Sequence, residues 1–459
     1  MTGALTAAGH RFAPRLSTPG GLRVGLLGVA LGALALGMAV RAAVDDEYRA
    51  IKIVCRDSAP SIVAAQHVAA GLADMEANLA NELLVPPAQQ EAWQKAYEAR
   101  RKEATDALLS AAENITYGDA ERGPIRTMLL ELPRFHAWAQ LARFDHGHGG
   151  TPAALDDYRS AAAIMTDQLM PAARALDAAN ARVLDETYRA RSGTAREMRA
   201  LVWLAGLVMI ALLAGVQLFV ARRTRRVLNA GMLAALVIAV GFLGRTLWHL
   251  GQSAELLRAA REDAFASVHA LWQARAVAYE ANTDESRWLL DPARRARYAG
   301  DFIARSDRIL KLPPGLSAAE VSGLGRRGQL PAATSGFVAD ELRNITFEGE
   351  LDAALKLLET RETYMKCDAK IRELEEAGQH GEAVRYCLSS APGESNWAFD
   401  QFDAALGKVL DINDRAFADI SARGFEELDG MGAFTLAACL LIPVTAFLGL
   451  RPRLREYAA

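Results

Sequence analysis

Aromatic residues and cysteine are scarce in this 459-residue chain, and charge of one sign does not dominate. Phe, Trp and Tyr make up 7% of the residues, and the chain has 4 cysteines. The 52 Lys and Arg residues nearly balance the 55 Asp and Glu residues, which gives a net charge of -3. This balance excludes a strongly basic nucleic-acid binder, so we expect no nucleic-acid partner.

Segments that alternate β-branched or aromatic residues with polar ones are also absent, so strands have little support. Ala, Leu, Glu and Arg are abundant instead, and these residues favour helices. The composition therefore predicts an all-α fold.

Sequence motifs of catalysis and metal binding are missing too. The chain has no nucleophile elbow, no phosphate-binding loop, no His-Glu-x-x-His and no paired CxxC. His146-Gly147-His148 places two imidazoles on a turn, but two histidines without further ligands make a weak metal site, and an exposed turn explains them better. We expect no enzyme activity, no catalytic residue, no metal site and no cofactor.

Apolar runs long enough to cross a lipid bilayer are present. They cover residues 24–40, 201–221, 228–250 and 431–450. Two long segments, 41–200 and 251–430, separate them and leave three short segments at 1–23, 222–227 and 451–459.

Each of the three short segments is rich in arginine, and positive charge marks the cytoplasmic side of a membrane. The arginines are Arg11, Arg15, Arg23, Arg222, Arg223, Arg225, Arg226, Arg451, Arg453 and Arg455. We therefore expect a multi-pass protein of the cell membrane with both termini cytoplasmic and both long segments outside. The first apolar run could instead be a cleaved signal peptide, which would leave both long segments outside.

The two halves of the chain resemble each other, as in a tandem duplication. The matching pieces occur in the same order: Glu76-Ala77-Asn78 with Glu280-Ala281-Asn282, Leu83-Leu84-Val85-Pro86 with Leu289-Leu290-Asp291-Pro292, Asn114-Ile115-Thr116-Tyr117 with Asn344-Ile345-Thr346-Phe347, and residues 176–185 with 402–411. Each half is then a span, an outer domain and a second span.

Helix-breaking residues divide the first outer segment into four helical pieces. The first piece ends at Leu84, the second covers about 88–113, the third ends near Phe144 and the fourth starts at Thr151. The second half follows the same plan, with an added Gly- and Pro-rich stretch at 313–337 that we interpret as a long loop. Four antiparallel helices bury their apolar stripes together, so the sequence predicts two tandem four-helix-bundle-like domains.

One segment of the second half carries a family resemblance. Glu285-Ser286-Arg287-Trp288-Leu289-Leu290-Asp291-Pro292, followed by Tyr298, resembles the run that closes the first long outer helix of CHASE-type sensor domains. The architecture is similar to the four-helix-bundle ligand-binding domains of chemoreceptors. The resemblance implies an input module, although the first half lacks the arginine and the aromatic residue at Asn81-Glu82-Leu83-Leu84.

Polar residues lie among apolar neighbours near this segment and at its counterpart in the first half. The candidates for binding a ligand are Glu76, Asn78, Glu280, Asn282, Glu285 and Arg287. They could face inward, to bind a small molecule or to hold a polar network, or they could form a solvated helix face with ion pairs. Arg287 is the first choice for binding an anion.

Two cysteines of the second outer segment are candidates for a disulfide. Cys367 and Cys387 lie on either side of a turn at Gly378–Gly381, on the face of the membrane that is oxidising. Because the two arms of the hairpin are unequal, the sulfurs would lie a helical turn out of level. The bridged and the free state both remain open.

The sequence as a whole indicates a membrane sensor or signal-relay protein. The short cytoplasmic segments cannot hold a domain, so we expect the signal to pass to a separate kinase or regulator, and the chain could form a homo-oligomer. The alternative is a non-enzymatic scaffold subunit of an envelope complex.

Overall fold

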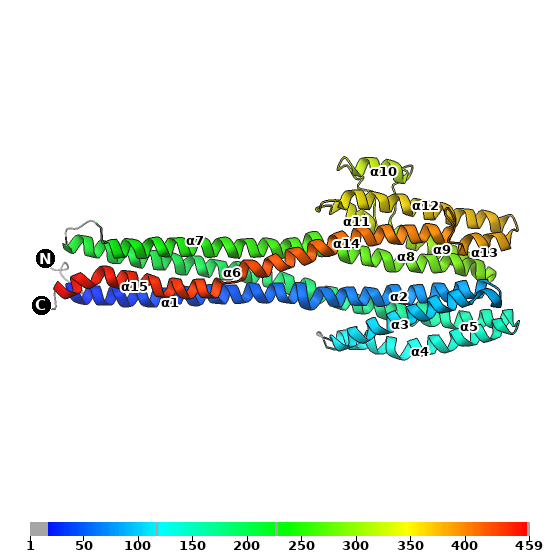
Figure 1. Cartoon of the computed structure of the whole chain (residues 1–459), viewed down its shortest axis with the longest axis horizontal. Coiled ribbons are helices and arrows are strands. Elements are labelled where there is room, and N and C mark those ends of the chain that lie inside the picture. Colours follow the sequence, from blue (N-terminus) through cyan, green and yellow to red (C-terminus); the bar gives the residue numbers. More distant parts are fainter. Residues whose placement is uncertain (1–16, 116–117, 225–227, 457–459) are drawn as a thin grey trace, which may run out of the picture. The chain divides into compact units, whose positions relative to one another are not determined.

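Regular structure in the described part of the chain is helical (Figure 1). The computed structural model describes residues 17–115, 118–224 and 228–456, and over these ranges no sheet forms beyond one isolated antiparallel bridge between Lys311 and Ser335. The all-α prediction is confirmed, as expected from the abundance of residues that lose little entropy in a helix. Arg11, Arg15, Thr116, Tyr117, Arg225 and Arg226, which entered the predictions above, lie outside the described residues.

The α-helices of the first half are α1 (Thr18–Ile51), α2 (Ala59–Leu84), α3 (Glu91–Glu113), α4 (Asp119–Gly147), α5 (Thr151–Ile164) and α6 (Met170–Thr224). Those of the second half are α7 (Ala230–Arg258), α8 (Ala266–Leu290), α9 (Arg295–Ile309), α10 (Ala318–Gly325), α11 (Phe337–Arg343), α12 (Glu350–Glu376), α13 (His380–Leu388), α14 (Ser395–Leu428) and α15 (Met431–Glu456). Short π-helical turns are η1 (Lys52–Ser58), η3 (Met165–Leu169) and η4 (Ala259–Phe265), and short 3-10 turns are η2 (Pro87–Gln89) and η5 (Pro292–Arg294).

The two halves begin with the same order of elements, which supports the inferred duplication. In each half an apolar helix leads through a π-helical turn into a second helix, a proline-started 3-10 turn and a third helix. The sequence placed the helix end at Leu84 and the helix start at Thr151 correctly, because Pro86-Pro87 and the glycines before Thr151 break the helical pattern.

The stretch at 313–337 is not a plain loop, contrary to the prediction. It contains α10, whose start is fixed by a capping box: the Ser317 hydroxyl accepts a hydrogen bond from the Glu320 amide at 3.3 Å, and the Glu320 carboxylate accepts one from the Ser317 amide at 2.8 Å. The Ser-x-x-Glu spacing of a capping box is visible in the sequence and indicates this helix start.

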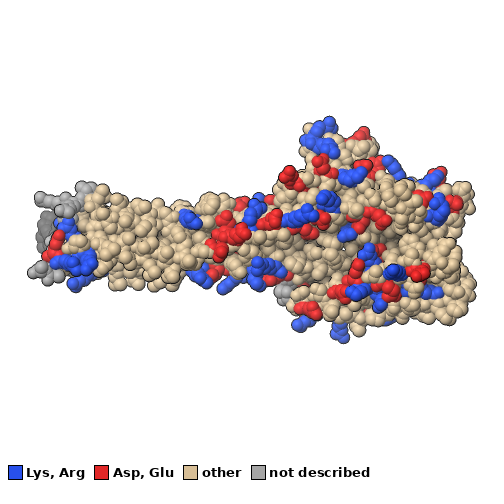
Figure 2. Space-filling view, viewed as in Figure 1, with Lys and Arg blue, Asp and Glu red and all other residues tan. Residues whose placement is uncertain are grey.

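The chain folds into two compact units. Unit 1 comprises 1–49, 190–255 and 424–459, and unit 2 comprises 50–189 and 256–423. Four helical stretches are long and apolar enough to cross a membrane, and they run over Thr18–Leu84, Thr151–Arg223, Ala230–Leu290 and Ser395–Glu456. On the face of unit 1 seen in Figure 2, a long band carries almost no Lys, Arg, Asp or Glu.

Small residues in unit 1 allow helices to approach closely. A Cβ at Gly32 would lie 3.0 Å from a side-chain carbon of Leu212 on α6. The backbones of α7 and α15 also approach closely: a Cβ at Gly231 would lie 2.7 Å from the backbone oxygen of Thr445 and would clash with the backbone of Gly449. Asn229 reinforces this contact, because its side-chain amide donates to the Gly449 carbonyl at 2.7 Å.

The outer segments of the two halves, predicted as two separate bundles, belong to the single unit 2. Helix α2 of the first half packs along α8 of the second (Figure 1). The apolar core of the first half also takes in Ala276 of α8, and the Thr283 hydroxyl donates to the Ala73 carbonyl of α2 at 3.2 Å. Each helix thus buries on the other a surface that a separate bundle would leave in water.

The Gly231 contact makes a prediction about unit 1. Gly231→Ala should destabilise the full chain by about 1–3 kcal/mol, because the added methyl meets backbone atoms that cannot rotate away. The measurement is the thermal unfolding midpoint in detergent, followed by circular dichroism. Gly244→Ala on the same helix is the control, since its Cβ would meet nothing within 4 Å. Equal midpoints for the two variants would contradict the close packing of α7 on α15.

Candidate functional site

The six residues singled out as ligand candidates are all buried. Each side chain is at most 8% exposed: Glu76, Asn78, Glu280, Asn282, Glu285 and Arg287. The solvated-face interpretation of these residues is therefore wrong. Helix α8 packs on α2 with one face and on helices of the second half with another, so polar side chains on both faces are buried.

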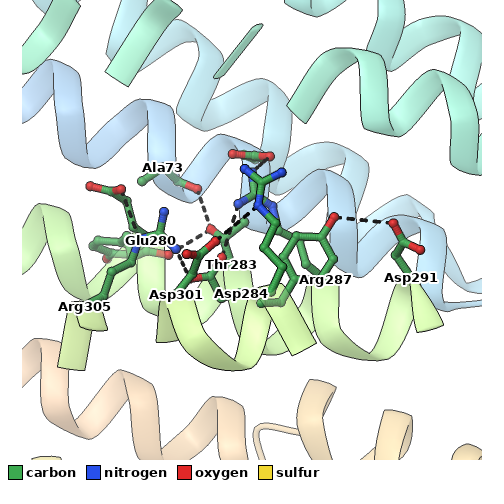
Figure 3. Close-up of polar contacts among 12 residues, drawn as sticks. Ala73, Glu280, Thr283, Asp284, Arg287, Asp291, Asp301 and Arg305 are labelled. Carbon is green, nitrogen blue, oxygen red and sulfur yellow. Dashed lines mark hydrogen bonds and ion pairs between the residues drawn. The ribbon is translucent and has the colours of Figure 1, made fainter. Parts of the chain in front are cut away.

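Arg287 is the centre of the buried polar contacts (Figure 3). Its guanidinium donates to the Glu76 carboxylate of α2, to the Asp284 carboxylate at 3.2 Å and to the Tyr158 hydroxyl of α5 at 3.2 Å. Burial raises the pKa of the Glu76 carboxyl, and the positive charge of Arg287 opposes this rise. Burial lowers the pKa of Arg287, but Glu76 and Tyr158 together outweigh burial and raise this pKa, so the guanidinium stays charged.

Two further arginines complete the network. Arg174 of α6 donates to both oxygens of Glu280, at 2.6 and 2.5 Å. Arg305 of α9 donates to Glu280 at 3.2 Å and also to Asp284. Three carboxylates and three guanidinium groups therefore balance one another: Glu76, Glu280 and Asp284 against Arg174, Arg287 and Arg305.

The space inside this network is too small for an organic ligand. The cavity lined by Glu76, Glu280, Arg287 and their partners has a volume of about 30 Å³, which holds about one water molecule. All three nitrogens of the Arg287 guanidinium are engaged. Of the two inward-facing interpretations, the geometry favours a polar network that joins α2 to α8.

The other three candidates lie apart from this network. The Asn78 amide donates to the Asp74 carbonyl at 2.7 Å and to the Asp74 carboxylate at 2.9 Å, within α2. Asn282 accepts a hydrogen bond from the Tyr364 hydroxyl of α12 at 3.4 Å. All six candidates are buried, but neighbouring positions on one helix point to different partner helices.

Glu285 faces a second buried cluster on α12, α13 and the start of α14. One carboxylate oxygen accepts from the Ser395 hydroxyl at 2.9 Å and from the Cys387 thiol at 3.4 Å, and the other has no hydrogen-bond partner. Burial, together with the nearby negative charge of Asp368, raises the pKa of Glu285 to about 8. The carboxyl is therefore protonated at neutral pH.

The candidate disulfide is not formed. Cys367 and Cys387 are both free and buried. The Cys367 thiol points to the Gly393 carbonyl at 3.7 Å, whereas the Cys387 thiol points to Glu285, in keeping with the unequal arms of the hairpin. Burial raises the pKa of both thiols, so neither is a reactive thiolate.

A larger cavity, of about 240 Å³, opens between α2, α3 and α8 and was not anticipated from the sequence. Its polar and aromatic lining consists of His67, Asp74, Arg100, Glu103, Trp272, Arg275 and Tyr279. The spacing of Trp272, Arg275 and Tyr279 puts them on one face of α8, which is a signal that sequence reasoning could have used.

Charged groups of both signs meet at this cavity. The Arg100 guanidinium lies 2.5 Å from the Asp74 carboxylate, and Arg275 binds both oxygens of Asp403 at 2.7 and 2.6 Å. Burial raises the pKa of Asp74 to about 6, although Arg100 opposes the rise. The Trp272 ring lies between the His67 ring, at 4.1 Å between centroids, and the Arg275 guanidinium, at 5.3 Å.

Arg287→Ala should destabilise the full chain by about 3–5 kcal/mol, because it leaves Glu76 and Asp284 buried without their partner. The loss is measured as the change in the free energy of unfolding in detergent. Arg294→Ala is the control: Arg294 lies 3.8 Å from Asp291 and is exposed, so its loss should cost less than about 0.5 kcal/mol. A loss for Arg287→Ala as small as the control's would show that the network contributes little to stability.

The contribution of Glu285 to stability should fall as the pH rises from about 4.5 to about 8. Because the pKa of Glu285 is raised from 4.5 to about 8, its contribution is fully present below the unfolded-state pKa and is lost as the pH rises through the folded-state value. The thermal midpoint, measured across this window, should therefore fall less steeply for Glu285→Gln, which keeps an uncharged acceptor toward Ser395. Glu373→Gln, at an exposed site, should leave the slope unchanged. A slope for Glu285→Gln equal to that of the unaltered protein would contradict the raised pKa.

Comparison with known proteins gives a family match. Residues 50–189 match the family described as the actinobacterial sensor domain. These bounds coincide with the part of the first half that belongs to unit 2, Ala50–Arg189. No curated protein and no solved structure matches the chain. The match falls on the first half, whereas the resemblance to CHASE-type domains rested on the second; what the two share is a helical sensor domain, which suggests a sensing role for this part of the chain.

Proposed function

We propose that the chain is a membrane sensor that binds a small molecule in unit 2 and relays the change through its apolar helices to a separate effector. The observation that carries the proposal is the cavity between α2, α3 and α8. Helices α2 and α3 of the matched sensor region form two of its walls, and α8 of the second half forms the third. A ligand held there contacts both halves at once and can change how they pack.

The lining of the cavity indicates the class of ligand. Its volume of about 240 Å³ is below the usual range for drug-sized ligands, so the ligand is small. Arg100 and Arg275 can receive a carboxylate, and Asp74 and Glu103 can receive an ammonium group. Trp272 and Tyr279 offer aromatic faces beside them. A small zwitterion such as a free amino acid satisfies all three features.

The relay follows from helix continuity. Helix α2 is part of the unbroken helical stretch Thr18–Leu84, and α8 is part of Ala230–Leu290, each of which contains an apolar span. A displacement of α2 against α8 is therefore transmitted along the same helices that carry the spans. Arginine-rich ends at Arg222, Arg223 and Arg451 support the orientation with both termini cytoplasmic, where a kinase or regulator would receive the signal. In this proposal the chain itself catalyses no reaction.

A cross-link within unit 1 can report the signal. A Cβ at Gly37 of α1 meets the Cys439 sulfur of α15, so Gly37→Cys creates a thiol pair with a native cysteine. In membrane vesicles, an amino acid that binds should change the rate of disulfide formation at least about twofold, because it shifts the population of helix arrangements. The rate is measured by gel mobility after thiol blocking, over a panel of free amino acids.

A matched pair of variants ties the response to the cavity. Ala107 lines the cavity on α3, and Ala107→Leu should fill part of it and abolish the response. Ala99→Leu, on an exposed position of the same helix, should leave the response intact. If the response survives Ala107→Leu, the ligand binds elsewhere; if no amino acid changes the rate or the thermal midpoint, the proposed ligand class is wrong.

A further inference from the structure

Two glutamates of the second half lie buried together, away from the cavity and from the Arg287 network. Glu341 on α11 and Glu350, the first residue of α12, are both 0% exposed. Their placement is unusual for carboxylates, because a buried charge normally has a partner of opposite sign. Among the described residues, neither glutamate forms an ion pair with a Lys, Arg or His side chain.

The hydrogen bonds of the pair leave one oxygen of each carboxyl without a donor. Glu350 accepts from the backbone amides of Thr346 and Phe347 at 2.6 and 2.9 Å, all on one oxygen. Glu341 accepts from the Asn413 amide of α14 at 3.2 Å. The remaining oxygens, Glu341 Oε2 and Glu350 Oε1, are buried with no hydrogen-bond partner.

The groups around the pair do not supply a positive charge. Helix α8 offers the Ser267 hydroxyl and α14 offers the Asn413 amide. The nearest arginine along the chain, Arg343, donates instead to Asp340 at 3.3 Å and to the Thr334 carbonyl. The acids of η4, Glu262 and Asp263, lie near Arg258, which has its own ion pairs with them at 3.6 and 3.2 Å.

The titration of Glu341 agrees with this geometry. Burial raises its pKa to about 8, the Ser267 hydroxyl opposes the rise, and the adjacent Glu350 adds to it. At neutral pH a proton on Glu341 can therefore be donated to the unpaired oxygen of Glu350, so that one hydrogen bond satisfies the unpaired oxygens of both carboxyls.

The pair borders the 344–349 loop, which is hydrogen-bonded to the π-helical turn η4. In that loop the Asn344 amide donates to the Asp263 carbonyl at 2.7 Å, to the Glu262 carbonyl at 3.2 Å and to the Ser267 hydroxyl at 2.9 Å. A π-helical turn disturbs the regular ladder of backbone bonds, and a side-chain amide can satisfy the carbonyls that it leaves. Asn344 belongs to the duplicated Asn-Ile-Thr motif, so this contact gives the motif a role in the second half.

We propose that Glu341 and Glu350 form a proton-binding site that latches the 344–349 loop onto η4. With the proton bound, a Glu341–Glu350 hydrogen bond closes the loop and keeps Asn344 on the η4 carbonyls. When the proton leaves Glu341, two adjacent buried negative charges repel each other. The loop then opens, and η4 loses the hydrogen bonds from Asn344. If the chain is the sensor proposed above, external acidity is then a second stimulus acting on the Ala230–Leu290 helix.

The latch belongs to the second half alone. Aligning the two Asn-Ile-Thr motifs places Ala111 opposite Glu341 and Ala120 opposite Glu350. The first half thus keeps the asparagine, Asn114, but has no carboxyl pair at the equivalent place. A proton would therefore act on one half and leave its counterpart unchanged.

The test follows the proton and the loop separately in the full chain, reconstituted in lipid nanodiscs. Infrared difference spectra between about pH 5 and pH 9 record the carbonyl band of protonated carboxylic acids. Amide hydrogen exchange of 259–267 records whether the loop still protects η4. All variants carry Glu285→Gln, because Glu285 is the other carboxyl whose pKa is raised to about 8. Burial raises the pKa of Glu47 only to about 7 and that of Asp74 only to about 6, so the band that is followed is the part that disappears near pH 8. Glu341→Gln removes the proton but keeps a donor toward Glu350, and Glu348→Gln, on an exposed position of the same loop, is the matched control.

With Glu341 intact, the band should disappear as the pH rises through about 8, and exchange at η4, corrected for its intrinsic pH dependence, should increase about tenfold. Glu341→Gln should lose the band and keep η4 protected at every pH, whereas Glu348→Gln should behave like the parent. A band that persists in Glu341→Gln, or an unchanged exchange rate across the titration, would overturn the proposal. So would suppression of the high-pH exchange by added Ca²⁺, which would make the pair a cation site. An amino-acid response that is missing in the cross-linking experiment would count only against the proposed ligand. The infrared band and the exchange rate do not depend on that ligand, so they test the proton site separately.

Discussion

The pairing of Arg287 with Glu76 is the contact on which the arrangement of unit 2 depends. A guanidinium that is 4% exposed and a carboxylate that is 3% exposed come from residues 211 positions apart in the chain. Neither charge can be buried without the other, because the cost of an unpaired buried ion is several kcal/mol. The helices α2 and α8 must therefore be in register before either polar stripe can leave water. Arg174 and Arg305 extend the same constraint to α6 and α9.

This kind of interface specifies an arrangement more strongly than it stabilises it. A fully apolar contact between α2 and α8 would tolerate slippage by a residue, whereas a neutral set of three carboxylates and three guanidinium groups is satisfied in one register. In the proposed sensor such a register matters, because a change of register is the kind of discrete change that continuous helices can transmit. The cavity beside Trp272 lies next to this interface on the same two helices.

Local patterns in the sequence predicted the elements, and long-range pairing limited what else could be predicted. The apolar runs and the helix end at Leu84 each depend on a few neighbouring residues, so they could be predicted from the sequence. Burial of the six polar candidates was one of two interpretations that their apolar neighbours allowed. Their partners could not be predicted, since Arg174, Arg305 and Tyr158 lie in other helices and no periodicity links them to Glu280 or Arg287. The joining of the two outer segments into one unit was missed for the same reason.

The charge balance of the network also determines which surfaces can pair. Glu76 and Arg174 come from the first half, whereas Glu280, Asp284, Arg287 and Arg305 come from the second. At the place of Arg287 the first half has Asn81, which carries no charge. A contact between two copies of the first half would lack the Arg287 guanidinium that pairs with Glu76. Although the halves resemble each other, their contact is therefore not self-complementary, and the charges of the network favour the pairing of unlike halves.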